Sequence, residues 1–135
     1  MTATGPAAGK VVHFEIPLDE PERGTRFYRD AFGWSLDRWG PTEYWTTPAG
    51  AGPGIGGALT RRAADCPAVT FYIACDDVEA ALQAVQQAGG TVLAGPAPIP
   101  GVGWMAPFED SEGNRLGLFQ EDPTAGVPPG TEPPR

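Results

Sequence analysis

Two short stretches of the chain, residues 10–16 and residues 69–73, alternate their side chains as a β-strand does. Apolar or aromatic residues fill every second position, which predicts strands with one face toward a core. Apolar residues at helical spacing follow each stretch and predict an amphipathic helix. The stripe of the first helix is Gly24, Phe27, Tyr28, Ala31 and Phe32, and that of the second is Val78, Ala81, Leu82, Val85 and Ala88.

Each predicted helix begins at an aspartate that has a glutamate three positions later, which is the spacing of a capping box. Each ends at a glycine, the residue that most readily adopts the left-handed conformation of a helix end. In the first helix a proline also occupies the first turn, where its missing N–H is not needed. The residues concerned are Asp19, Pro21, Glu22 and Gly33 in the first helix and Asp76, Glu79, Gly89 and Gly90 in the second.

Three short extended segments are expected after each helix, which makes the two halves copies of one β-α-β-β-β unit. A constant offset of 57 residues carries Asp19 onto Asp76 and Gly33 onto Gly90, and such self-similarity is the mark of an internal repeat. The segments cover residues 34–39, 44–47 and 55–60 in the first half and residues 91–94, 103–108 and 115–120 in the second, with a turn at residues 110–114.

This repeat predicts an α+β fold in which two βαβββ modules form an open, cup-shaped eight-stranded barrel with the helices on the outside. One helix covers only one face of a four-stranded sheet, so the uncovered faces are expected to enclose a cavity for a ligand. We expect a flexible N-terminus at residues 1–9 and a single domain at residues 10–121, with repeats 10–60 and 67–121. Residues 122–135 are rich in Pro and Gly and are expected to form a disordered tail.

Composition narrows the choice of partners and compartment. The 135 residues carry a net charge of −8, which argues against binding to nucleic acid. No apolar run approaches the roughly 20 residues that span a bilayer, and no secretory segment is evident, so we expect no membrane partner and a cytoplasmic location. The two cysteines, Cys66 and Cys75, flank one predicted strand and are expected to be free thiols.

Five motifs together resemble the vicinal oxygen chelate superfamily, which includes glyoxalase I, bleomycin-resistance proteins and extradiol dioxygenases. The motifs are HFEIP at 13–17, FY at 27–28 before FGW at 32–34, GIGG at 54–57, IPGVGW at 99–104 and DSEGN at 110–114. The resemblance covers about residues 10–121 and is strongest to bacterial glyoxalase-like proteins. It implies a small-molecule ligand in the cup, and it also implies that two copies can form a homodimer.

The resemblance also implies where a metal would be held. Metal enzymes of the superfamily place four ligands around one divalent ion, and these positions fall on His13, Thr70, Gly57 and Gly117. Only His13 has a side chain that binds a metal well, whereas stable sites use three or four protein ligands. We therefore expect no bound metal and no other cofactor.

Strand alternation selects the residues expected to line the cup. His13 and Glu15 are expected to face inward on the first strand, and Thr70 with Tyr72, and Gly117 with Phe119, on the strands of the second repeat. The two glycines, Gly57 and Gly117, would widen the cavity. Several aromatic residues could form a stacking surface for a flat ligand, or could simply pack in the core; they are Trp39, Tyr44, Trp45 and Trp104.

The candidate chemistry centres on His13, the only histidine of the chain. As a general base it could be tuned by Glu15, which lies two residues away on the same strand face. Three functions remain open. The first is a metal-independent protein that binds a small aromatic or amphipathic molecule. The second is a lyase or isomerase that uses His13 and Glu15 for proton transfer, or a metal-dependent member of the superfamily. The third is an interaction protein that pairs through its sheet edges.

Overall fold

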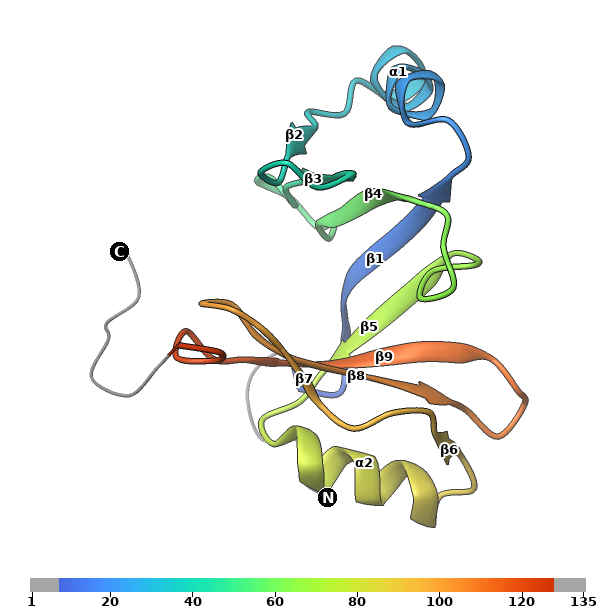
Figure 1. Ribbon diagram of the computed structural model, residues 1–135, viewed down its shortest axis with the longest axis vertical. Helices are drawn as coiled ribbons and strands as arrows, with labels where there is room; N and C mark the ends of the chain where they lie inside the picture. Colours follow the sequence, from blue (N-terminus) through green and yellow to red (C-terminus); the bar gives the residue numbers. More distant parts are fainter. Residues whose placement is uncertain (1–7, 128–135) are drawn as a thin grey trace. The chain divides into compact units, whose positions relative to one another are not determined.

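A computed structural model describes residues 8–127 of the chain (Figure 1). These residues form two compact units, and each is described by itself. The first unit contains residues 12–71, and the second contains residues 72–127 together with residues 8–11. The predicted α+β class and the two βαβββ modules are confirmed by the order of the elements.

The first unit has one helix and a four-stranded mixed sheet. Its elements are β1 (Val11–Leu18), α1 (Pro21–Phe32), β2 (Asp37–Arg38), β3 (Tyr44–Thr47) and β4 (Gly57–Arg61). The strand order is β2-β3-β4-β1, in which β1 and β4 run parallel and the other pairs run antiparallel. The parallel pair sets the register of the unit, because it aligns Phe14 with Gly57 and Ile16 with Leu59.

The core of the first unit lies on the α1 side of this sheet. Leu18, Leu36 and Leu59 are buried there, and Leu59 is fully inaccessible to solvent. Tyr28 of α1 stacks on Trp34 with ring centroids 4.7 Å apart, and both rings pack against the leucines. The helix approaches the end of β1 so closely that a side chain at Gly24 would collide with Leu18.

The ends of α1 agree with the prediction at its C-terminus and differ at its N-terminus. Pro21 occupies the first position, and Gly33 ends the helix with a φ of 70°. The predicted cap Asp19 is wrong, because the N-cap residue is Glu20 and no side chain caps the helix. Asp19 instead pairs with Arg62 at 2.7 Å, an interaction that lowers the pKa of its carboxyl group.

The second unit repeats this connectivity with one strand more. Its elements are β5 (Thr70–Ala74), α2 (Val78–Gln87), β6 (Thr91–Val92), β7 (Ala97–Ile99), β8 (Gly103–Glu109) and β9 (Arg115–Glu121). The order is β5-β9-β8-β6, and β7, which the sequence did not predict, also pairs with β8. Pro98 in β7 is typical of an edge strand, where no ladder N–H is needed.

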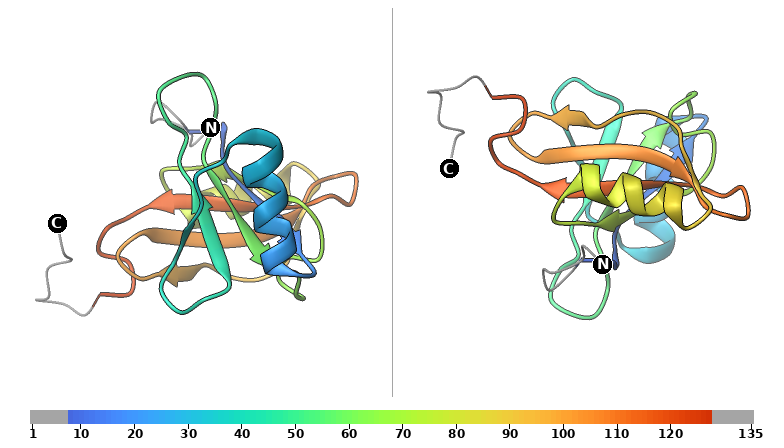
Figure 2. Two further views of the ribbon diagram at one scale, coloured as in Figure 1. Left: turned by 90° about the horizontal axis from the view of Figure 1, so that it is seen from above. Right: turned by 90° about the horizontal axis from the view of Figure 1, so that it is seen from below.

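Helix α2 lies across its sheet and covers the core of the second unit (Figure 2). The helix contributes Val78, Ala81 and Leu82 to this core, and the strands contribute Ala106, Phe108 and Leu118. The cap of α2 is Asp77 and not the predicted Asp76, so the capping-box spacing placed the start of the helix one residue too early. The Asp77 side chain accepts hydrogen bonds from the backbone N–H groups of Glu79 and Ala80.

Residues just outside the predicted domain make contacts at both of its ends. Near the N-terminus, the Gly9 N–H donates to the Ala74 carbonyl at 2.8 Å. After β9, Asp122 accepts a hydrogen bond from Trp104 Nε1 at 3.0 Å, and Ala125 is buried. The expected disordered tail is therefore wrong for residues 122–127, and residues 1–7 and 128–135 lie outside the described residues. No described helix has the length and apolar character needed to cross a membrane.

The two helix starts give a matched test of capping. We expect Asp77→Ala to lower the free energy of unfolding by about 1 kcal/mol, because two backbone donors lose their acceptor. Glu20→Ala, at the corresponding position of α1, is expected to cost less than about 0.5 kcal/mol, because it removes only an exposed ion pair with Arg23. Urea unfolding followed by circular dichroism measures both, and equal losses would contradict the assignment of the caps.

Candidate functional site

Three polar side chains of the first unit form a linked group on the sheet face opposite α1. His13 and Glu15 come from β1, where alternation directs them away from Phe14 and Ile16. Tyr44 comes from β3, two strands away. Its hydroxyl oxygen lies 2.8 Å from His13 Nε2 and 2.7 Å from Glu15 Oε2. We call these three residues the His13–Glu15–Tyr44 group.

The intervening strand β4 makes this long reach possible. Ala58 stands between Glu15 and Thr46 in the register, and it is fully buried. Tyr44 itself pairs with Thr60 of β4, so its side chain crosses β4 to reach His13 and Glu15 on β1.

The hydrogen bonds assign the protons of the group. The Tyr44 hydroxyl donates its one proton to the Glu15 carboxylate, so its oxygen accepts from His13 and the proton of a neutral His13 lies on Nε2. His13 Nε2 and Glu15 Oε2 are 3.8 Å apart, which makes an ion pair when the imidazole is protonated. The side chains of His13 and Glu15 are 31% and 14% exposed, so the group is reachable but largely shielded from water. It can both supply and accept a proton at one place.

Trp39 provides an apolar surface beside this group. Its ring centroid lies 5.6 Å from that of Tyr44, and the residue is 48% exposed. The Trp39 N–H donates to the Tyr44 carbonyl at 2.8 Å, which fixes the two residues at the β2–β3 turn. Sequence reasoning selected Trp39 and included Tyr44 only as one of several aromatics. The role of Tyr44 depends on the pairing of β3, β4 and β1, which no local signal reveals.

The prediction that Gly57 widens a cavity lined by His13 is wrong, because the two residues lie on opposite faces of the sheet. The register places Gly57 beside Phe14, and a Cβ at Gly57 would collide with the Phe14 ring. That ring lies 5.6 Å from Trp34 on the α1 side of the sheet. The glycine makes room for Phe14 in the packing under the helix and does not widen a cavity beside His13.

Trp45 and Trp104 also belong to the helix side of their sheets. Trp45 packs against the leucine core of the first unit, with the Arg38 guanidinium 5.3 Å from its ring centroid. Trp104 packs against the core under α2 and donates to Asp122. The expectation that Trp45 and Trp104 lie on the sheet faces away from the helices is wrong, and the alternative of core packing describes both.

The remaining predicted residues lie at several places. Thr70 is buried and donates to the Ala68 carbonyl at 3.2 Å. In the second unit Tyr72 pairs with Gly117, and a Cβ at Gly117 would overlap the Tyr72 ring. Phe119 lies opposite Met105 on the same sheet face, since Leu116 and Leu118 pack toward α2.

The donor set does not fit a divalent metal. Of the four positions at which the resemblance implies ligands, two are glycines whose side-chain space is filled by the rings of Phe14 and Tyr72. A third, Thr70, is committed to a backbone carbonyl. Within residues 8–127, no three His, Cys, Asp or Glu side chains come together in a way that could hold an ion.

The surroundings of both cysteine thiols raise their pKa and so favour the protonated form. Burial and the neighbouring Asp77 and Asp76 raise the pKa of Cys75 to about 11. Burial is also the main reason that the pKa of Cys66 is raised, with Glu15 adding to it. Both cysteines are free, as predicted. Because the thiolate is the nucleophilic form, neither residue is a candidate for covalent chemistry.

Comparison with known proteins identifies the family. A family model described as "Glyoxalase/Bleomycin resistance protein/Dioxygenase superfamily" matches residues 10–118. The chain belongs to this superfamily. The Glyoxylase-like domain-containing protein of Didymella fabae is 30% identical over 116 residues, which are 78% of this chain and 89% of that protein. The Anthracycline biosynthesis protein DnrV of Streptomyces peucetius is 27% identical over 155 residues, covering 90% of this chain and 52% of its own length. The chain thus spans about half of DnrV.

Solved structures agree with the superfamily fold. Methylmalonyl-CoA epimerase from Mycobacterium tuberculosis matches with a TM-score of 0.63 and 14% identity, over 91% of this chain and 94% of that one. A hypothetical protein from Bacillus halodurans matches with a TM-score of 0.65 and 13% identity, over 84% and 94% of the two chains. At this level of identity the likeness concerns the fold and not the activity.

Replacing one hydroxyl tests the His13–Glu15–Tyr44 group. We expect Tyr44→Phe to lower the free energy of unfolding by about 1–3 kcal/mol, because a shielded carboxylate and an imidazole both lose a hydrogen-bond partner. Tyr28→Phe is the matched control, because the structure gives the Tyr28 hydroxyl no hydrogen bond within residues 8–127 and its ring stacking is kept. Chemical denaturation of both variants is the measurement. A Tyr44→Phe protein as stable as the control would show that the hydroxyl does not join the other two side chains.

Proposed function

We propose that this superfamily member binds a small aromatic or amphipathic organic molecule without a metal ion, and that the His13–Glu15–Tyr44 group contacts it. The observation that carries the proposal is the linked group itself. Two hydrogen bonds, of 2.8 and 2.7 Å, hold an imidazole, a phenol and a carboxylate together on one sheet face. Such a preorganised set recognises a polar substituent with little loss of side-chain entropy.

The apolar part of the ligand would rest on Trp39. An indole that is half exposed and in contact with Tyr44 offers a face on which a flat molecule can stack. The relation to a protein named for anthracycline biosynthesis agrees with a small organic ligand. The other residues that the sequence suggested for binding, Thr70, Tyr72, Gly117 and Phe119, stay part of the proposal as further contacts.

Metal independence is supported by the donor set. A catalytic ion needs about three protein ligands, and the described residues bring no three His, Cys, Asp or Glu side chains together. His13 and Glu15 are moreover already engaged with Tyr44. Homodimer formation also belongs to the proposal and can be measured by light scattering.

The alternative function is proton transfer by a glyoxalase-like lyase or isomerase. It is favoured by one observation, namely that Glu15 is well shielded and its proton donor, Tyr44, also contacts His13. A carboxylate and an imidazole joined in this way could take a proton from a carbon acid and return it. Binding and turnover therefore need separate measurements.

Adding metal ions tests the proposal that the protein binds its ligand without a metal. We expect the melting temperature to change by less than about 1 °C when Zn²⁺, Ni²⁺ or Mn²⁺ is added or when EDTA is present, because an ion bound only to the folded state would raise it. Differential scanning fluorimetry measures the shift. A large rise that disappears in His13→Ala would mean that His13 is a metal ligand.

Binding of an uncharged hydroxylated aromatic compound tests the proposal that the His13–Glu15–Tyr44 group contacts the ligand. We expect 1-naphthol to bind saturably, and its Kd to rise by about tenfold in His13→Ala, because one hydrogen bond to the hydroxyl is lost. Arg115→Gln is the control, since Arg115 lies at the exposed start of β9. Titration calorimetry measures Kd, and unchanged affinity in His13→Ala would refute the proposed contact.

Turnover is checked on the same samples. Recovery of unaltered compound after incubation supports a binding protein. Conversion of a carbonyl-containing candidate by the wild-type chain, lost in both His13→Ala and Glu15→Gln, would favour the enzyme.

A further inference from the structure

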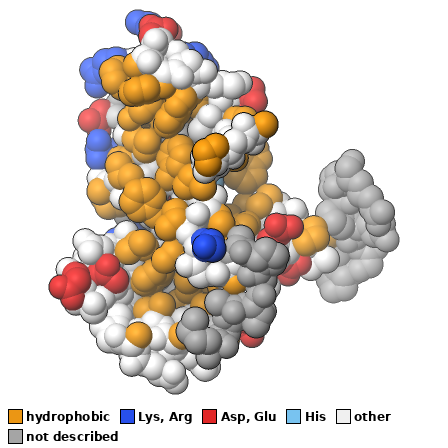
Figure 3. Space-filling model, turned by 180° about the vertical axis from the view of Figure 1, so that it is seen from behind, with side chains coloured by type: hydrophobic (Ala, Val, Ile, Leu, Met, Phe, Trp, Pro, Cys, Tyr) orange, Lys and Arg blue, Asp and Glu red, His pale blue; other side chains and the backbone are white. Residues whose placement is uncertain are grey.

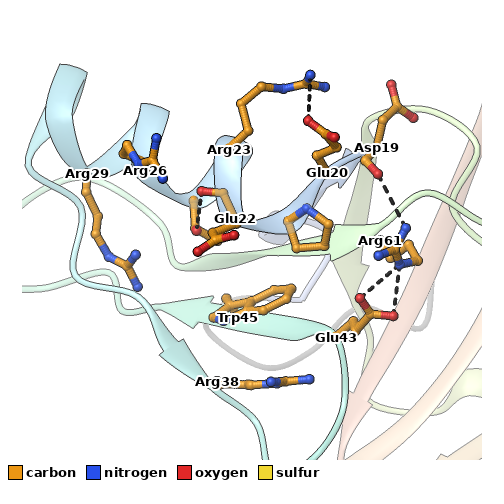
Figure 4. A pocket seen from close by; sticks show the side chains of 12 residues that line it. Asp19, Glu20, Glu22, Arg23, Arg26, Arg29, Arg38, Glu43, Trp45 and Arg61 are labelled. Carbon is orange, nitrogen blue, oxygen red and sulfur yellow. Dashed lines mark hydrogen bonds and ion pairs between the residues drawn. The ribbon is translucent and has the colours of Figure 1, made fainter.

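A hollow lies in the first unit, on the α1 side of the sheet and therefore on the opposite face from His13. It is open to solvent, has a volume of about 1040 Å³, and is bounded by the first turns of α1 and by β3 and the end of β4 (Figure 4). Its floor contains Trp45, which the register places beside the core residue Leu59. Nothing in the function proposed above uses this hollow.

The lining of the hollow combines five arginines with four acidic residues. Three of the four carboxylates already form ion pairs with arginines. Glu43 binds Arg61 at 2.8 Å, Glu20 binds Arg23 at 2.8 Å, and Asp19 binds Arg62, which lies outside the lining. Glu22 is the carboxylate left over. Within residues 8–127, Arg26 and Arg29 have no carboxylate within ion-pair distance. The unpaired charge in the hollow is therefore positive.

This concentration of arginine is unusual for so acidic a chain. The whole sequence has nine Lys and Arg residues and a net charge of −8, yet five of the nine line this one hollow. Arg26 and Arg29 are three positions apart on one helix, where like charges repel and destabilise the helix. An anion bound between them would relieve that repulsion.

Arg38 and Trp45 add a flat surface to the positive charge. The Arg38 guanidinium lies along the Trp45 indole, 5.3 Å from its centroid, and donates to the carbonyls of Thr42 and Pro41. These bonds fix Arg38 in place on β2. Figure 4 shows Arg29 extending from α1 toward the strands that carry Arg38 and Trp45. A guanidinium fork matches the planar geometry of a carboxylate, and an indole matches an aromatic ring.

We propose that this hollow binds a small aromatic carboxylate, whose anionic group lies between Arg26 and Arg29 and whose ring lies toward Trp45. The single unpaired acid, Glu22, favours a ligand with one negative charge over one with two or more. The proposal is independent of ligand binding at the His13–Glu15–Tyr44 group.

The test uses 2-naphthoate as the probe and titration calorimetry of the full chain. We expect saturable binding whose Kd rises at least tenfold in Arg26→Gln/Arg29→Gln and also rises with added salt. Arg115→Gln should bind as the wild type does, because Arg115 lies outside the hollow. His13→Ala should also leave the Kd unchanged, which separates this site from the other one.

Two comparisons fix the chemistry of the ligand. The neutral analogue 2-naphthalenemethanol should bind at least tenfold more weakly, and inorganic phosphate should not displace 2-naphthoate. The proposal is overturned if 2-naphthoate does not bind, if the double variant binds it equally well, or if phosphate competes with it at similar concentration. Melting curves of the variants, whose exposed side chains leave the core untouched, confirm that each one is folded.

Discussion

The parallel register of β1 and β4 is the constraint on which the first unit depends. It aligns Phe14 with Gly57, and because Gly57 has no side chain, the Phe14 ring can turn toward Trp34 and the helix. Once Phe14, Ile16 and Leu18 face α1, His13 and Glu15 must face the other way. A slip of one residue would exchange the two sets and would bury a histidine and a glutamate under the helix. The same glycine therefore settles both the core and the candidate site.

Local sequence signals were sufficient for the fold. The strand and helix periods, Pro21 and Gly33 predicted the elements and their order, because each depends on residues close together in the chain. The errors lie at helix starts, where tertiary contacts decide the outcome. Asp19 has the spacing of a cap but binds Arg62, which is 43 residues away. The composition of residues 122–127 predicted a disordered tail, but the Trp104 indole donates a hydrogen bond to Asp122 at the start of this turn.

The candidate site was predictable only in part, because it depends on pairing between distant strands. Alternation along β1 identified His13 and Glu15, but the hydroxyl that joins them comes from Tyr44 and reaches them across strand β4. Gly57, Trp45 and Trp104 were assigned to the wrong face, because the repeat aligns positions in the two halves without saying which way each side chain points. The apolar stripe predicted for α1 is also only partly buried, because Phe27 and Phe32 are 56% and 63% exposed. Apolar side chains are prominent on the surface seen in Figure 3.

The two helices differ in how firmly their first turns are held. Asp77 ties down the start of α2 with two hydrogen bonds, whereas α1 begins at Glu20 with no side chain on its free N–H groups. Uncapped helix ends open at a lower cost in free energy than capped ones, and their amide protons exchange sooner. The first turn of α1 is also a wall of the arginine-lined hollow. Fraying at that turn would enlarge the entrance to the hollow while the leucine core beneath stayed intact.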